Sequence, residues 1–146
     1  MSEEQIKSAI RGFIKSMTAG DSKQAISFLA DDVVWVTPYG TFKGKPAIVK
    51  YLAWVNKIVK DYRVNENGIG IITQGDTGII EHNLLGVTNA KKWEIPAMCI
   101  YEFKEEKIQN MRTFFDRASQ AKQAAKGVIA KWAVNAVVNA TEKGLR

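Results

Sequence analysis

Two residue types that often carry acid–base or nucleophilic chemistry each occur once in this 146-residue chain. His82 is the one histidine and Cys99 is the one cysteine. A histidine with an ordinary pKa exchanges its proton near neutral pH, so His82 could act as a general acid or base, or bind a ligand oxygen. A cysteine becomes a nucleophile once its thiol ionises, and His82 could assist that step.

Both residues also have a structural explanation. His82 could be a strand histidine whose ring nitrogens bond to a neighbouring hydroxyl or backbone carbonyl. No second group that would orient His82 as a catalytic base is visible in the sequence. Cys99 could be a small buried side chain that packs as an aliphatic residue does, and we favour this explanation for Cys99.

The sequence predicts no cofactor and no metal. One histidine and one cysteine do not form the cluster of nitrogen and sulfur ligands that a zinc-type site needs. The chain also has no glycine-rich phosphate loop and no dinucleotide-binding motif.

Charge is concentrated at the C-terminal end. The net charge is +6, and residues 117–146 hold six Lys and Arg against one acid, which leaves the body nearly neutral. A basic tail of this kind is not a nucleic-acid-binding face, so no nucleic acid is expected as a partner.

The first residues, MSEEQIKSAIRGF, have no apolar core of the signal-peptide type. With a single cysteine and no apolar window long enough for a membrane span, we expect a cytoplasmic protein that does not use the membrane as a partner.

Three helices are predicted in the first part of the chain. Ser2 is expected to cap the first, with Gln5 as its capping-box partner, and Asp21 to cap a short second one. The third is expected after Gly44, because Pro46 suits the first position of a helix.

Strands dominate the middle of the sequence. A short strand is predicted at residues 33–37, and four longer ones at residues 62–73, 77–87, 93–103 and 107–115, with hairpin-like connections. Gly68 and Gly70 predict a bulge or bend in the first long strand. The predicted class is therefore α+β: three helices against one face of a curved antiparallel sheet, with a cone-shaped cavity between them and an extra C-terminal helix.

The alternation of side chains along a strand indicates which residues line this cavity. We expect His82 as the candidate catalytic residue, and a candidate ligand-binding set of Trp35, Thr37, Cys99, Tyr101 and Thr113. Glu81, Arg112 and Asp116 are expected on the opposite face, with an ion pair between Glu81 and Arg112.

Residues 117–146 form a predicted helical extension after a domain at residues 1–116. One interpretation lays this helix over the cavity or over a partner subunit, which would bury Val128, Ile129 and Trp132. The other interpretation is a basic amphipathic helix that docks on an acidic membrane or partner. We favour the first, because an alanine-rich stripe is modest for membrane insertion.

The order of the predicted elements, with the segments ADDVVWVTPYGTFKGKPAI and MRTFFD, resembles the nuclear transport factor 2-like superfamily. Within it the chain is most similar to the SnoaL-like group, which includes polyketide cyclases, ketosteroid isomerase and limonene epoxide hydrolase. The resemblance covers roughly residues 3–116 and implies the cone-shaped fold. Because this fold hosts many chemistries and also plain binding modules, the resemblance does not name a reaction.

Residues that match the catalytic groups of ketosteroid isomerase lack the required chemistry. The resemblance places Thr37 at the general base, Phe13 at the oxyanion-binding tyrosine and Cys99 at its protonated aspartate. None of the three provides the carboxyl or phenol group of the isomerase, so that reaction is not expected here.

The epoxide hydrolase pattern is also incomplete. Its Arg-x-Asp falls on His82-Asn83-Leu84, and its later arginine–aspartate pair falls on Arg112-Thr113. Activation of water by paired carboxylates needs acids at those positions. Polyketide cyclases of the group use an acid on the last strand, where Thr113 stands.

Two functions remain open at this level. The first is binding of a small hydrophobic molecule of polyketide, terpenoid or steroid type, with isomerase, cyclase or hydrolase chemistry at His82 if the protein is an enzyme. The alternative is a non-catalytic module that binds a ligand or another protein. The resemblance further implies a homodimer formed through the outer face of the sheet.

Overall fold

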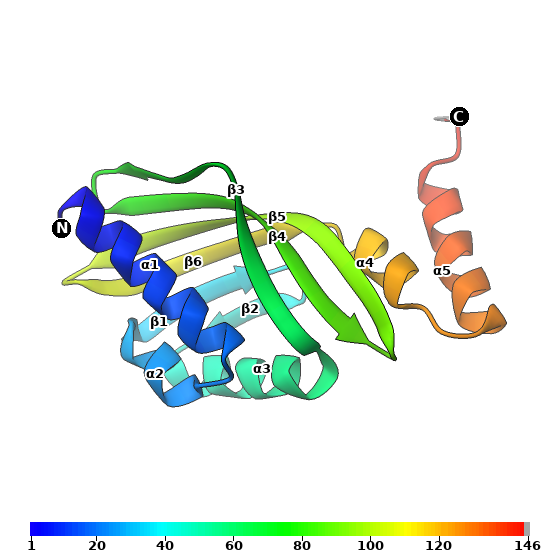
Figure 1. Ribbon diagram of the computed structural model, residues 1–146, viewed down its shortest axis with the longest axis horizontal. Coiled ribbons are helices and arrows are strands. Elements are labelled where there is room, and N and C mark those ends of the chain that lie inside the picture. The colour runs from blue at the N-terminus through cyan, green and yellow to red at the C-terminus, as the bar shows by residue number, and fades with distance from the viewer. Residues whose placement is uncertain (145–146) are drawn as a thin grey trace.

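The computed structural model describes residues 1–144 (Figure 1). In it, the three N-terminal helices begin after the residues that the sequence predicted. Helix α1 (Glu3–Thr18) follows Ser2, whose hydroxyl accepts the Gln5 N–H while the Gln5 side chain accepts the Ser2 N–H. Helix α2 (Ser22–Ser27) follows Asp21, whose carboxylate accepts the Gln24 N–H. Helix α3 (Lys45–Ile58) follows Gly44 and carries a proline in its first turn. The Ser2 and Asp21 side chains satisfy backbone N–H groups that have no partner inside the helix, whereas Gly44 makes no side-chain bond of this kind.

Six strands form one sheet in the order β2-β1-β6-β5-β4-β3. Their bounds are β1 (Leu29–Thr37), β2 (Gly40–Lys43), β3 (Lys60–Gln74), β4 (Thr77–Thr88), β5 (Lys91–Lys104) and β6 (Lys107–Phe115). The hairpins from β3 to β6 are antiparallel, as predicted. The sheet as a whole is mixed, because β1 pairs with β6 in parallel. No hairpin joins these two strands, so their relative direction could not be read from the sequence. The short edge strand β2 was not predicted.

The predicted bend in the first long strand is confirmed. The register between β3 and β4 shifts between Glu66 and Ile71. Gly68 and Gly70 within this interval have φ angles of +57° and +76°, which side chains with a Cβ rarely adopt. The bend lets the sheet curl around the three N-terminal helices (Figure 1).

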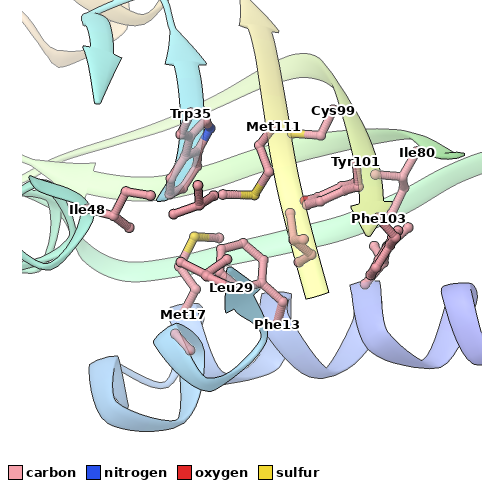
Figure 2. Close-up of a cluster of buried hydrophobic side chains, with 14 of the residues drawn as sticks. Phe13, Met17, Leu29, Trp35, Ile48, Ile80, Cys99, Tyr101, Phe103 and Met111 are labelled. Atoms are coloured by element: carbon pink, nitrogen blue, oxygen red, sulfur yellow. The ribbon is translucent and has the colours of Figure 1, made fainter. Parts of the chain in front are cut away.

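The main core lies between helix α1 and the concave face of the sheet. Ile6, Ile10 and Phe13 of α1 are fully buried. Phe13 meets Trp35 and Tyr101 edge to face, with ring centroids 5.9 and 6.2 Å apart (Figure 2). Phe13 is thus a packing residue and offers no hydroxyl to the interior.

The C-terminal extension forms two helices, where the sequence pattern predicted one. Helix α4 (Arg117–Ala124) ends before Gly127, whose φ of +85° breaks the helical path, and helix α5 (Val128–Thr141) follows. Helix α4 packs against β5, and α5 projects away from the body (Figure 1). The predicted burial of Val128, Ile129 and Trp132 is not present in the single chain, where they are 85%, 83% and 71% exposed. Leu145 and Arg146, at the end of the predicted extension, lie outside the described residues.

Within residues 1–144, no helix has the length and apolar character needed to cross a membrane.

Candidate functional site

Four side chains from four different strands form a buried hydrogen-bonded chain on the concave face. The Trp35 indole Nε1 lies 2.9 Å from Thr113 Oγ1, and Thr113 Oγ1 lies 3.3 Å from Cys99 Sγ. Cys99 Sγ lies 3.8 Å from His82 Nε2, and His82 Nδ1 lies 3.3 Å from the Ile80 carbonyl oxygen. Strand register explains why these side chains meet. Cys99 is directly opposite Thr113, and His82 is opposite Ala97, which lies two residues from Cys99 on the same face of β5.

The two ends of this chain set the direction of every bond in it. An indole N–H can only donate and a backbone carbonyl can only accept. Trp35 therefore donates to Thr113, the Thr113 hydroxyl donates to Cys99, and the thiol donates to His82 Nε2. His82 then carries its proton on Nδ1 and donates it to Ile80. We assign this tautomer from the bonding pattern. The result is a neutral chain in which each group has a partner.

Burial keeps the titratable members of the chain neutral. His82 is 2% exposed, and desolvation lowers its pKa below the ordinary value despite the Ile80 carbonyl and the charge of Glu66. Burial raises the pKa of the Cys99 thiol to about 11, although Thr113 and Tyr101 oppose this shift. At neutral pH the site thus presents a neutral imidazole ring and an un-ionised thiol, which is a poor nucleophile.

The structure brings together His82, Cys99, Thr113, Trp35 and Tyr101, but not Thr37. All of these except Thr37 line one interior cavity. The Thr37 hydroxyl accepts the Tyr39 N–H at 3.0 Å and donates to the Gly40 carbonyl at 3.2 Å, so it stabilises the turn between β1 and β2.

The interior cavity has a volume of about 30 Å³. That is enough for one or two water molecules, but far below the roughly 300 Å³ of a typical small-molecule site. Aromatic and aliphatic side chains fill the rest of the cone. The cavity is lined by Ile14, Met17, Trp35, Tyr51, Leu52, Val55, Tyr62, Val64, His82, Leu84, Cys99, Tyr101, Thr113 and Phe115.

Helix α4 contacts strand β5 and the turn after β1, through individual bonds that the sequence pattern did not predict. The Tyr39 hydroxyl donates to Gln120 Oε1 at 2.6 Å. The Arg117 guanidinium lies 4.6 Å from the centre of the Tyr39 ring and donates to the Pro38 carbonyl at 3.2 Å. On the other side, the Gln123 side chain bonds to the backbone N–H and carbonyl of Glu94 at 2.9 and 3.0 Å. Polar residues repeat at 3–4 spacing along α4, and this pattern was the sequence signal from which these contacts could have been predicted.

The outer face of the sheet differs from its prediction in one contact. Arg112 pairs with Glu102 at 2.6 Å, so the predicted ion pair with Glu81 is wrong. Glu102 lies on the strand next to Arg112, whereas Glu81 lies one strand further away. Asp116 caps helix α4 by accepting the N–H groups of its first turn. Apolar side chains that are partly exposed on this face include Val36, Met98 and Phe114.

No group of three or more His, Cys, Asp or Glu side chains within residues 1–144 could hold a metal ion.

Comparisons with known proteins agree with this architecture. The model of the SnoaL-like domain matches residues 10–111. An NTF2-like protein of unknown function from Burkholderia pseudomallei superposes with a TM-score of 0.77 at 16% identity, over 86% of this chain and 100% of that one. A search of curated protein sequences gives no match.

Two further solved structures carry functional information in their descriptions. An LEH-like epoxide hydrolase from M. tuberculosis has a TM-score of 0.72 at 17% identity, covering 89% of this chain and 96% of that one. TerC, co-crystallised with polyporic acid, has a TM-score of 0.74 at 20% identity, covering 84% of this chain and 99% of that one. At these identities the likeness establishes a shared fold. Since the domain model spans more than half of the sequence, the chain belongs to the SnoaL-like domain family.

Proposed function

We propose that this protein binds a small hydrophobic molecule of polyketide, terpenoid or steroid type inside the cone, through neutral hydrogen bonds and without chemical turnover. The observation that carries the proposal is the chain from Trp35 through Thr113 and Cys99 to His82, set in an otherwise apolar lining. Apolar cavities with a few convergent polar groups are typical of ligand sites. The co-crystallisation of TerC, which has the same fold, with polyporic acid supports a small-molecule ligand.

Binding requires the cone to enlarge, since the interior cavity now has about 30 Å³. Helix α4 is suited to such a movement because none of its residues is buried. The hydrogen bond from Tyr39 to Gln120 and the contacts of Gln123 with Glu94 hold it in place. Exchange of these few polar contacts for water would release α4 from Tyr39 and β5 and give the cone room to widen.

A second candidate function is an isomerase, cyclase or hydrolase in which His82 is the acid or base. Its support is that His82 Nε2 holds a lone pair that only the Cys99 thiol occupies, at a long distance of 3.8 Å. A ligand hydroxyl could replace the thiol there. The absence of a carboxylate from the cavity lining makes this the weaker candidate.

We also propose a cytoplasmic homodimer formed through the outer sheet face. The partly exposed Met98 and Phe114 support this, since both lose contact with water when a second sheet covers them. The free thiol of Cys99 agrees with a reducing compartment.

The experiment for the binding proposal is a thermal-shift screen of small hydrophobic compounds, followed by mass spectrometry of each hit. Wild type, Thr113→Val and His82→Gln are compared, with Thr41→Val as a control on the exposed strand β2. We expect at least one compound that raises Tm for wild type and the control, raises it less for Thr113→Val, and is recovered unchanged. Recovery of an altered compound that depends on His82 would replace the proposal with the enzymatic candidate. Equal stabilisation of all four proteins would refute an interior site.

A further inference from the structure

A groove on the surface of the body is lined by aromatic rings and one lysine, and it is distinct from the interior cavity. It lies between helix α3 and the β1–β2 hairpin and has a volume of about 460 Å³, within the range of small-molecule sites. We call it the aromatic groove. Its lining residues are Tyr39, Phe42, Ala47, Lys50, Tyr51 and Trp54.

The spacing of residues on α3 builds one wall of this groove. Lys50 and Trp54 are four residues apart, and Ala47 and Tyr51 occupy the same face of the helix. The hairpin supplies the other wall. A single helical face therefore presents an ammonium group next to exposed aromatic surface.

Three of the four rings in the groove are nearly parallel, and the fourth, Tyr39, is steeply inclined to them. Phe42 and Tyr51 stack with centroids 4.4 Å apart and planes inclined by 22°. Tyr51 and Trp54 are inclined by 23° at 6.1 Å, and Tyr39 meets Trp54 edge-on at 5.0 Å. Flat rings favour a flat aromatic partner, by offset stacking or edge-to-face contact.

The groove is open and its charge is positive. Trp54 is 41% exposed, which is large for a tryptophan in a concave surface. The Lys50 ammonium is exposed, has no hydrogen bond or ion pair with any residue from 1 to 144, and no carboxylate lines the groove. Aromatic rings alone would also attract a cation. Lys50 repels a cation and attracts an anion, so the groove favours an anionic ligand over a cationic one.

Other spaces in the described part of the chain fit such a ligand less well. The interior cavity is too small. A depression of about 430 Å³ near the ends of β3, β4 and β5 is lined by both acids and bases, among them Asp61, Arg63, Lys92 and Glu94.

We propose that the aromatic groove binds planar aromatic carboxylates, with the ring against Trp54 and Tyr39 and the carboxylate on Lys50. The groove and the interior cavity share one residue, Tyr51, whose side chain lines both. The other residues that line the groove do not line the interior cavity, so the proposal for the groove does not rest on the proposed interior site.

The test is an NMR titration of the full chain with 2-naphthoate, followed through the tryptophan indole N–H signals. The Trp54 signal, assigned with Trp54→Ala, is expected to shift, while the signal of exposed Trp132 on α5 stays in place. Trp54→Ala should weaken 2-naphthoate binding by at least about tenfold. Lys50→Gln should weaken it by about two- to fivefold, as expected for an exposed ion pair.

Matched controls separate the charge from the shape of the ligand. Lys57→Gln removes an exposed lysine from the same helix outside the groove and should leave the affinity unchanged. The neutral analogue 2-naphthamide should bind Lys50→Gln and wild type equally. Thr113→Val, which alters the interior site, should not change 2-naphthoate binding, so this test and that of the interior site can fail separately.

Three results would overturn the proposal. One is an unmoved Trp54 signal at saturating 2-naphthoate. Another is an equal effect of Lys50→Gln and Lys57→Gln on its affinity. The third is tighter binding of a naphthyl trimethylammonium ion than of 2-naphthoate, which would make the groove a cation site.

Discussion

The inner and outer faces of the sheet are built from alternate residues of the same strands, yet they differ in almost every property. On β6, Thr113 points inward to Trp35 and Cys99, whereas its neighbours Arg112 and Phe114 point outward. The inner face is closely packed, and the four side chains of its buried hydrogen-bonded chain are neutral. The outer face combines a charged pair with apolar side chains that remain partly in water.

This difference predicts on which face a substitution will destabilise the fold. A change on the inner face leaves a buried group without a partner or leaves an empty space, and both are costly. A change on the outer face of the single chain meets mostly solvent. Its effects should therefore appear in association with other chains more than in folding.

The largest expected effect is the loss of Trp35 from the inner face. Trp35 is nearly buried and contacts Phe13 and Tyr51 edge to face. Trp35→Ala should lower the free energy of unfolding by about 3–5 kcal/mol, measured by urea denaturation. Phe114→Ala on the outer face, where the ring is 48% exposed, serves as the matched control and should cost less than about half as much. Similar losses for the two variants would break the distinction between the faces.

A smaller effect is expected when one hydroxyl is removed from the buried chain. Thr113→Val keeps the shape of the side chain but leaves the Trp35 N–H without its acceptor. This should cost about 1–3 kcal/mol of unfolding free energy. Thr41→Val, on the exposed edge strand, should be close to neutral in the same urea experiment. If the two valine variants were equally stable, the hydrogen-bonded chain would contribute nothing to folding.

The pH dependence of stability provides a third comparison. Burial lowers the pKa of His82 in the folded state, so the unfolded chain binds a proton more readily. Stability from neutral His82 is therefore complete above the unfolded pKa of about 6.5 and is lost as pH falls from there through the lower folded pKa.

Urea denaturation of wild type and His82→Gln at pH 7.5 and pH 5 measures this contribution. We expect wild type to lose more stability than the variant between the two pH values. Identical losses would mean that His82 is already protonated, or freely solvated, in the folded protein.

The smallest effect on folding, but a large one on association, is expected on the outer face. The double variant Met98→Ser, Phe114→Ser should change the unfolding free energy of the single chain by no more than about 1 kcal/mol, because both side chains are partly exposed. Sedimentation equilibrium should show a dimer for wild type and a larger monomer fraction for the variant. A monomeric wild type would remove the proposed dimer.

Most of the fold could be predicted because its signals are local. The caps at Ser2 and Asp21 and the bend at Gly68 and Gly70 depend on residues close in the sequence, and all were found as expected. The parallel pairing of β1 with β6 depends on contacts between distant residues and was missed. The break at Gly127 was missed because one glycine in an apolar pattern is compatible with either a continuous or a broken helix.

The site could be predicted only in part. Alternation along the strands correctly placed His82, Cys99 and Thr113 on one face. It could not reveal that the Thr37 hydroxyl is used by its own turn. The cavity volume was also beyond prediction, because it depends on how neighbouring side chains pack.

The bonds between Gln123 and Glu94 have a consequence for solubility. Strand β5 pairs with β6 only from Ala97 onward, so its first residues have β4 on one side and no strand on the other. Such a free strand edge is a template on which another chain can add a strand. The Gln123 amide occupies the N–H and carbonyl of Glu94 in the way a neighbouring strand would. Helix α4 thus protects the sheet against edge-to-edge aggregation, and a chain that ended at Asp116 would lose that protection.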